Sequence, residues 1–126
     1  MKPETSDASL IVAVGRITLR PGASRLRFIF HTIMSLWQAK RAEGCVHAST
    51  NGADGAHYSM SVWRSEDTMR AYARSGAHLR SMRAARRFAE EARFRHWHAA
   101  TVPDWRAALD RFRALNAREA QRDRAA

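Results

Sequence analysis

The feature that most constrains the fold is the order in which strand-like and helix-like segments follow one another along the chain. Residues 10–19 (LIVAVGRITL) form an apolar, β-branched run that is typical of a buried strand. Pro21 and Gly22 end this run, and Ser24 can then cap a helix that Gly44 ends in a left-handed conformation. Within that helix, side chains recur at helical spacing, and we expect their stripe to face a core. The stripe consists of Leu26, Ile29, Phe30, Ile33, Trp37 and Lys40.

The rest of the chain predicts further strands and helices, separated by turn-forming residues. Ser65, followed by two acidic residues, is a favourable helix start. The expected elements are strands at residues 45–50, 57–64 and 93–102, a hairpin loop at 51–55, a helix after Ser65 with a break at Ser75 and Gly76, and a last helix at 104–120. The order is then β-α-β-β-α-β with an added C-terminal helix. This α+β, ferredoxin-like split βαβ order predicts an antiparallel sheet of four strands with two helices on one face.

The third expected strand has two faces of different polarity, because successive side chains alternate between the faces of a sheet. Tyr58, Met60 and Val62 form the more apolar face, which we expect to meet the helices. The opposite face is expected to line the interior of a barrel, and it consists of His57, Ser59, Ser61 and Trp63. One sheet face still needs a cover, and a second copy of the chain is the usual one. We therefore expect a homodimer that forms an α+β barrel.

The sequence predicts one domain with a short segment at each end. Residues 1–8 are polar and mixed in charge and are expected to be a disordered N-terminal segment. Residues 9–117 form the expected domain, and residues 118–126 a polar C-terminal tail. No run of residues is long and apolar enough to span a membrane, and the N-terminus lacks the pattern of a secretion signal. A cytoplasmic location is therefore expected.

The chain is strongly basic, with a formal net charge of +10 that comes almost wholly from arginine. Six arginines lie on the helix after Ser65, mostly opposite its apolar stripe, so we expect them to face solvent. They are Arg70, Arg74, Arg80, Arg83, Arg86 and Arg87. No recognised nucleic-acid-binding motif accompanies them, and no exposed aromatic residues for base stacking are evident among them, so the sequence disfavours nucleic acid as a partner. The arginines can instead steer an anionic substrate toward a pocket.

Two segments carry a resemblance to a known superfamily. Residues 61–72 (SVWRSEDTMRAY) and the following SGAH, which ends at His78, resemble the strand-to-helix signature of the antibiotic biosynthesis monooxygenase-like superfamily, the dimeric α+β barrels. That signature has a tryptophan at the end of the third strand, a helix start with serine and glutamate, and a histidine after a short break. The sequences HW at residues 96–97 and PDW at residues 103–105 look like a subgroup described as DUF3291-like or spheroidene monooxygenase-like.

This resemblance implies an activity class as well as a fold. The superfamily includes cofactor-free quinol monooxygenases, haem-degrading monooxygenases, haem-containing enzymes and proteins with no known activity. It implies a small monooxygenase-like oxidoreductase that acts on a hydrophobic aromatic or polycyclic small molecule. His78 matches the histidine that is the proximal haem ligand in the haem-degrading members, so the expected cofactor is none or haem. Those members carry an asparagine on the first strand, and residues 10–19 have none.

Histidines dominate the candidate chemistry, because an imidazole near neutral pKa can remove a proton from a phenolic substrate. We expect His78, His57 and His96 to be catalytic. The expected substrate-binding residues are Trp63, Tyr72, Ser59, Ser61, His98 and Trp97. His96 and His98 share a face of one strand and can both ligate one metal, but no Asp or Glu lies on an expected strand, so no metal site is expected.

Two alternatives to an oxygenase stay open. The first is a haem-binding barrel that uses His78, because the small residues Gly76 and Ala77 let a flat ligand approach the helix closely. The second is a non-catalytic ligand-binding or stress-response barrel, which an interior closed by side chains favours.

Overall fold

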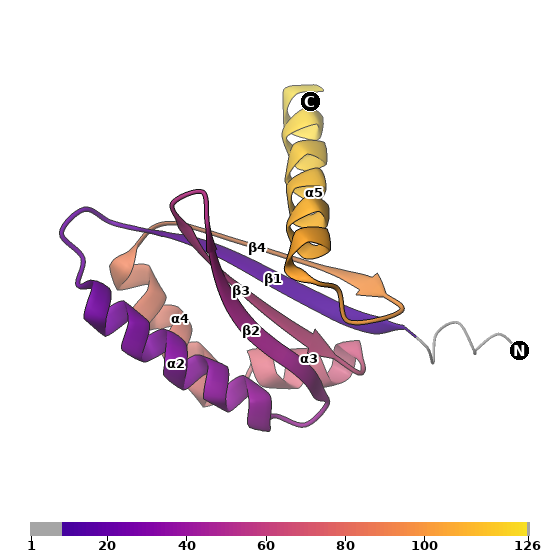
Figure 1. The fold of residues 1–126 in the computed structure, drawn as a ribbon, viewed down its shortest axis with the longest axis horizontal. Helices are drawn as coiled ribbons and strands as arrows, with labels where there is room; N and C mark the ends of the chain where they lie inside the picture. The colour runs from indigo at the N-terminus through magenta and orange to yellow at the C-terminus, as the bar shows by residue number, and fades with distance from the viewer. Residues whose placement is uncertain (1–8, 126) are drawn as a thin grey trace, which may run out of the picture.

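The structure of the chain is a computed structural model that describes residues 9–125, the side chain of Ala77 excepted. The expected disordered segment, residues 1–8, lies outside the described residues. Figure 1 shows one sheet with helices on both of its sides. In chain order the elements are β1 (Leu10–Leu19), α2 (Arg25–Arg41), β2 (Cys45–Ala53), β3 (Ala56–Trp63), α3 (Glu66–Ala73), α4 (Gly76–Phe88), β4 (Ala89–Ala99) and α5 (Trp105–Ala125).

The strands form one antiparallel sheet in the order β2-β3-β1-β4, which confirms the predicted α+β, ferredoxin-like arrangement. The bounds of β2 and β4 differ from the prediction. Asp54 and Gly55 both have positive φ and form a tight turn, so β2 continues to Ala53 and the hairpin loop is shorter than expected. β4 begins at Ala89 rather than at residue 93, because the far end of β1 supplies pairing partners there, and it ends at Ala99 rather than at residue 102.

The break predicted in the second helical region is confirmed. Ser65 caps α3 by accepting the backbone N–H of Thr68 at 3.2 Å. Ser75 caps α4 in the same way by accepting the backbone N–H of His78 at 3.2 Å. Each serine satisfies a backbone donor that a helix start leaves without an internal partner, so the region folds as two short helices.

The helices α2, α3 and α4 cover the sheet face opposite to the one predicted. The ring of Phe28 on α2 lies 4.7 Å from that of His57, and the ring of Tyr72 on α3 lies 5.2 Å from that of Trp63. The serine-bearing face of β3 therefore lies beneath these helices. The prediction that the face of Tyr58 meets them is wrong, because alternation along a strand fixes which side chains share a face but not which helices cover it.

The last helix, α5, packs on the other face of the sheet. Tyr58, Met60 and Val62 are buried there, and the ring of Phe112 stands edge-on to that of Tyr58 at 5.9 Å. The chain's own last helix thus packs on the face of Tyr58, and the homodimer stays a prediction. α5 continues to Ala125, so residues 118–125, predicted to be a tail, are helical, and Figure 1 shows them reaching beyond the sheet.

The apolar stripe of α2 is turned away from the core, contrary to the prediction. Phe28 and Ala39 are the buried residues of this helix, at 6% and 7% exposure. Leu26 is 81% exposed and Trp37 57% exposed, on the outer side. The stripe was correctly recognised as a continuous apolar face, but spacing alone does not distinguish a face that packs inward from one that faces outward.

Substitution of Phe112 by alanine tests the packing of α5. Phe112 is 1% exposed, so removal of its ring leaves a cavity, and we expect the free energy of unfolding to fall by about 3–5 kcal/mol. Urea denaturation measures this change. Arg111→Ala on the exposed side of the same helix is the control and is expected to change stability little. Equal stability of the two variants would contradict the placement of α5.

Candidate functional site

A floor of small side chains lies in the middle of the sheet, on the side of α2, α3 and α4. The register of β1 with β3 and β4 sets this floor, because residues paired across strands point to the same side. Bulkier side chains border the small ones at the β4 side and at one end. The rows from β3 through β1 to β4 are Ser59, Gly15 and Phe94, then Ser61, Ala13 and His96, then Trp63, Ile11 and His98.

Because Gly15 has no side chain, the aromatic ring of Phe94 packs directly on this floor. A Cβ atom at Gly15 would lie 2.5 Å from a ring carbon of Phe94 and 3.2 Å from Ser59 Oγ, so any larger residue would displace the ring. Phe94 is nevertheless 43% exposed, and Ser59 is exposed as well. Because both residues point toward the helical side, solvent reaches the floor. We refer to this solvent-exposed area around Ser59 and Phe94, on the side of the sheet that carries α2, α3 and α4, as the cleft.

A pocket of about 390 Å³ opens between α4 and β4 on the same side of the sheet. Phe94 and Ala92 supply its floor, and Met82 and Ala85 of α4 supply its apolar wall. Arg86 stands at the same wall. The lining is largely apolar with a few charged groups, which is typical of sites for small organic molecules.

Three aromatic side chains form a chain at the break between α3 and α4. The ring of Tyr72 lies 5.2 Å from that of Trp63 and 5.1 Å from that of His78. The indole N–H of Trp63 donates to Ser61 Oγ at 2.9 Å, and the hydroxyl of Tyr72 donates to the carbonyl of Ser35 at 3.4 Å. Burial raises the pKa of Tyr72, so its hydroxyl keeps its proton at neutral pH. Trp63 belongs to the floor, so this cluster connects His78 to the end of the cleft.

The surroundings of His78 favour a neutral imidazole with one free nitrogen. Its Nδ1 lies 3.0 Å from the carbonyl oxygen of Ala73. A carbonyl can only accept, so Nδ1 carries the proton and Nε2 has the lone pair. Burial lowers the pKa of His78, and the hydrogen bond to Ala73 opposes this effect in part. At neutral pH Nε2 can therefore accept a proton or ligate a metal ion.

The structure separates the three predicted catalytic histidines. His57 lies beneath Phe28, where burial and then the nearby Arg25 lower its pKa. His96 lies two strands away from His57 and is displaced by four residues of register, or about 13 Å along the strands. It is also exposed, whereas His57 and His78 are partly buried. The three side chains therefore do not form one constellation.

The remaining predicted site residues divide between the two sheet faces. Ser59, Ser61 and Trp63 lie on the cleft side, as does His98, which is exposed and has Nδ1 3.1 Å from Ser9 Oγ. Trp97 lies on the opposite face, partly buried against the core that α5 covers, so it does not line the cleft. Among these residues, Ser61 and Trp63 connect directly to the aromatic cluster.

Within residues 9–125, no group of three His, Cys, Asp or Glu side chains gathers as a metal site would require. β4 does carry Glu90 and Glu91, which the sequence had placed before the strand. Glu91 pairs with Arg16 at 2.7 Å rather than with a histidine. The two carboxylates therefore leave the expectation about metal unchanged.

Sequence reasoning missed the residues that shape the cleft. Gly15 gave a signal, because an isolated glycine within an apolar strand indicates a close approach. Phe94 gave none, because its place beside Gly15 follows from the register of β1 with β4, which the sequence does not contain locally. Met82 and Ala85 appeared as an apolar stripe of α4, without an indication that they line a pocket.

Comparison with known proteins relates this chain to one protein family. A family model described as DUF3291, a domain of unknown function, matches residues 32–124. None of the curated protein sequences compared with this chain matches it. No helix in the described part of the chain has the length and apolar character that a membrane crossing requires.

Several solved structures share the architecture at low sequence identity. A variant of SnoaB, a cofactor-independent oxygenase from Streptomyces nogalater, matches with a TM-score of 0.65 at 18% identity, over 75% of this chain and 98% of the other. A conserved protein from Methanosarcina mazei matches with 0.67 at 12%, over 75% and 96%. A candidate antibiotic biosynthesis monooxygenase from Chloroflexus aurantiacus matches with 0.58 at 16%, over 75% and 95%. These similarities show the fold.

The pH dependence of stability tests the environment of His78. Its folded-state pKa lies below its ordinary value of 6.5, so the unfolded chain binds more protons in that range. We expect the free energy of unfolding to fall as pH decreases from about 7 to about 5, and His78→Gln to reduce that slope. Urea denaturation across pH measures the slope, and NMR titration of the imidazole measures the pKa.

His57→Gln is the matched comparison, because burial also lowers the pKa of His57. It is expected to remove a separate part of the slope. An imidazole at residue 78 that titrates above 6.5 would refute the neutral, partly buried state described above.

Proposed function

Because this chain belongs to the DUF3291 family and shares its fold with a cofactor-independent oxygenase, we propose that it is a small monooxygenase-like oxidoreductase. Its substrate is a hydrophobic aromatic or polycyclic molecule that binds in the cleft. The observation that carries the proposal is the floor of small residues next to the cluster of Trp63, Tyr72 and His78.

The floor is suited to a flat ring system. Ala13, Ser59 and Ser61 project little from the sheet, so a ring can lie against the strands beside Phe94. Phe94 lies at one border of this area and offers an aromatic surface for contact. The hydroxyl of Ser59 makes no hydrogen bond within residues 9–125 and can bind a phenol or carbonyl of the substrate.

His78 is the proposed base. Nε2 takes a proton from an acidic carbon flanked by aromatic rings, and the resulting carbanion gives its electron pair to O2 to form a peroxide. The peroxide takes the proton back from His78 and then loses water, which leaves a carbonyl on the ring. One oxygen atom thus enters the substrate and the other leaves as water, so no external reductant is needed.

Oxidation of anthrone to anthraquinone is a direct test, because anthrone has such an acidic carbon between two rings. We expect the protein to accelerate O2 uptake and anthraquinone formation. His78→Gln should reduce the rate by about a hundredfold or more. Ser59→Phe, which fills the cleft, should reduce it by about tenfold or more.

Two variants serve as controls. Ser49→Phe places the same bulk on β2, with the side chain on the other face of the sheet. His47→Gln removes an imidazole on that same face, where it contacts Ser49. Both should keep the activity. Equal losses in these controls would show that the cleft is not the site, and anthrone binding without O2 uptake would favour a non-catalytic binding protein.

A haem-binding function is the second candidate, since Nε2 of His78 is free while Nδ1 donates to a carbonyl, as in many ligating histidines. The residue fits an axial ligand, and haem would supply redox chemistry at iron. Titration with haem should produce a Soret band that His78→Ala abolishes and His57→Ala retains. No band with the unmodified protein would exclude this candidate.

A further inference from the structure

The outer side of α2 is an apolar surface that the fold leaves uncovered. Leu26, Phe30, Ile33 and Trp37 recur at helical spacing and lie within about 60° of one another around the helix axis. They are 81%, 61%, 51% and 57% exposed. Phe28, on the opposite side of the helix, packs on the sheet. We call these four residues the outer stripe.

The outer stripe lies within a strongly basic surface. The sequences of α2 and α4 contain no Asp or Glu. Ser35 Oγ donates to Ser81 Oγ at 2.7 Å, so the two helices lie side by side and form one layer. Among the described residues, none of the basic side chains of this layer lies within ion-pair distance of a carboxylate. These side chains are Arg25, Arg27, Lys40, Arg41, Arg80, Arg83, Arg86 and Arg87.

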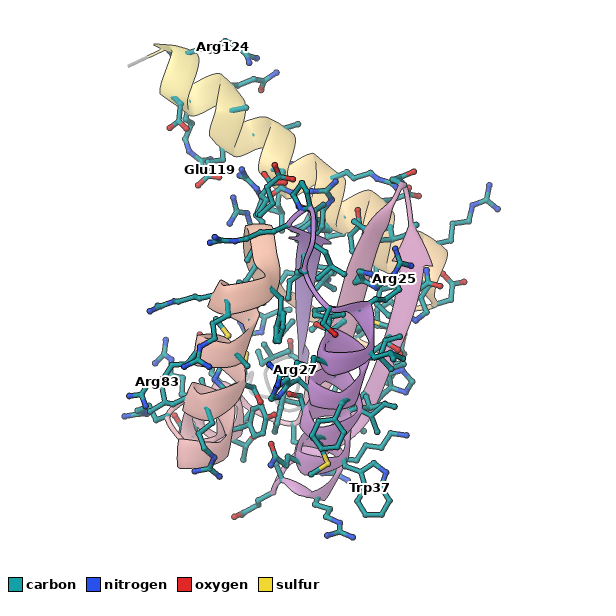
Figure 2. The ribbon with its side chains drawn as sticks, turned by 90° about the vertical axis from the view of Figure 1, so that its left-hand side faces the viewer. Arg25, Arg27, Trp37, Arg83, Glu119 and Arg124 are labelled. Atoms are coloured by element: carbon teal, nitrogen blue, oxygen red, sulfur yellow. The ribbon has the colours of Figure 1, made fainter. Side chains whose placement is uncertain are left out.

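A basic pocket of about 430 Å³ lies between the two helices. Arginines from both helices line it, together with His31 and Phe88. Figure 2 shows Arg27 between α2 and α4, Arg83 on the outer flank of α4, and Trp37 near the C-terminal end of α2. The lining arginines are Arg27, Arg80, Arg83 and Arg87. Guanidinium groups bind phosphate through several parallel hydrogen bonds, so arginines from two helices around one pocket suit a phosphate group.

We propose that the layer of α2 and α4 docks on the surface of an anionic lipid bilayer. The outer stripe enters the boundary between headgroups and acyl chains, and the flanking arginines bind lipid phosphates. An interfacial helix has this composition, with Leu, Phe and Trp on one side and basic residues beside them. This surface lies on the helical layer, whereas the cleft lies between that layer and the sheet, so the proposal does not depend on the oxygenase activity.

Charge selects the bilayer over a second copy of the chain. Two copies that met through their outer stripes would bring together two layers with no acidic residue, so their arginines would repel one another. An anionic bilayer instead offers phosphates to the arginines and an apolar interior to the stripe. Arg41 already lies 4.5 Å from the centre of the Trp37 ring, so a cation stands at the edge of the stripe.

Vesicle flotation with the full chain tests the proposal. We expect binding to vesicles of phosphatidylcholine with phosphatidylglycerol, and little binding to phosphatidylcholine alone. The double variant Leu26→Ser with Phe30→Ser removes apolar contact, and the triple variant Arg80→Gln, Arg83→Gln and Arg87→Gln removes charge. Each should weaken binding by about tenfold or more. Circular dichroism confirms that both variants remain folded.

A matched triple variant on α5 separates a localised surface from general charge. Arg111→Gln, Arg118→Gln and Arg122→Gln remove the same charge from another part of the molecule and should leave most of the binding. Trp37 supplies a second measurement, since its fluorescence should shift to the blue on vesicle binding. The shift should disappear in Trp37→Phe.

Three results would overturn the proposal. The first is no flotation with anionic vesicles, which would leave an acidic protein as the partner of this surface. The second is an equal loss of binding in the α4 and α5 triple variants. The third is an oligomer in analytical ultracentrifugation that the double variant of Leu26 and Phe30 converts to monomer, which would make the outer stripe a contact between copies.

Discussion

The simultaneous pairing of β1 with β3 and β4 is the interaction on which the rest of the structure depends. β1 is a central strand, so its register decides which side chains of three strands face the same side. A shift by one residue would exchange the two faces of β1. It would move Gly15 from beneath Phe94 and bring Val14 there, and the larger side chain would displace the ring of Phe94. The cleft is therefore a property of strand pairing more than of any local motif.

The distribution of charge follows the same division into two sides. Glu91 and Glu119 bind Arg16, Arg93 and Arg95 around β4 and α5. Asp54 at the hairpin turn binds Arg113 of α5 at 2.5 Å. Acidic residues thus compensate arginines near α5, while the layer of α2 and α4 has none. The excess positive charge of the chain is concentrated on the layer of α2 and α4, where the outer stripe is exposed. Neither the net charge nor the apolar stripe alone would indicate that the two coincide.

Local sequence predicted the elements that depend on local chemistry. The apolar run of β1, the serine caps at Ser24 and Ser65, and the left-handed Gly44 at φ 83° are all as expected. Each of these depends on residues within a few positions, and their physical requirements leave little choice of conformation.

Features that depend on distant partners were not predictable in the same way. The periodicity of β3 predicted two faces of different polarity, but which helices cover each face depended on the packing of α5. The periodicity of α2 predicted one apolar stripe, but the side of the helix that meets the sheet is the side of Phe28. Likewise, His57, His78 and His96 were each plausible as bases, yet their distances depend on the register of the sheet. The cluster of Trp63, Tyr72 and His78 was closest to prediction, since a short sequence segment contains all three.

Coverage of both sheet faces by the chain's own helices has a consequence for unwanted association. Strand addition could then occur at the sheet's margins, β2 and β4, whose outer backbone groups have no partner strand among residues 9–125. β4 carries the charged residues Glu90, Glu91, Arg93 and Arg95, and these two arginines are held by carboxylates of the same strand and of α5. A foreign strand that aligned with β4 would have to place its own side chains beside these charged groups. The charged margin therefore protects an open-ended sheet against growth into aggregates.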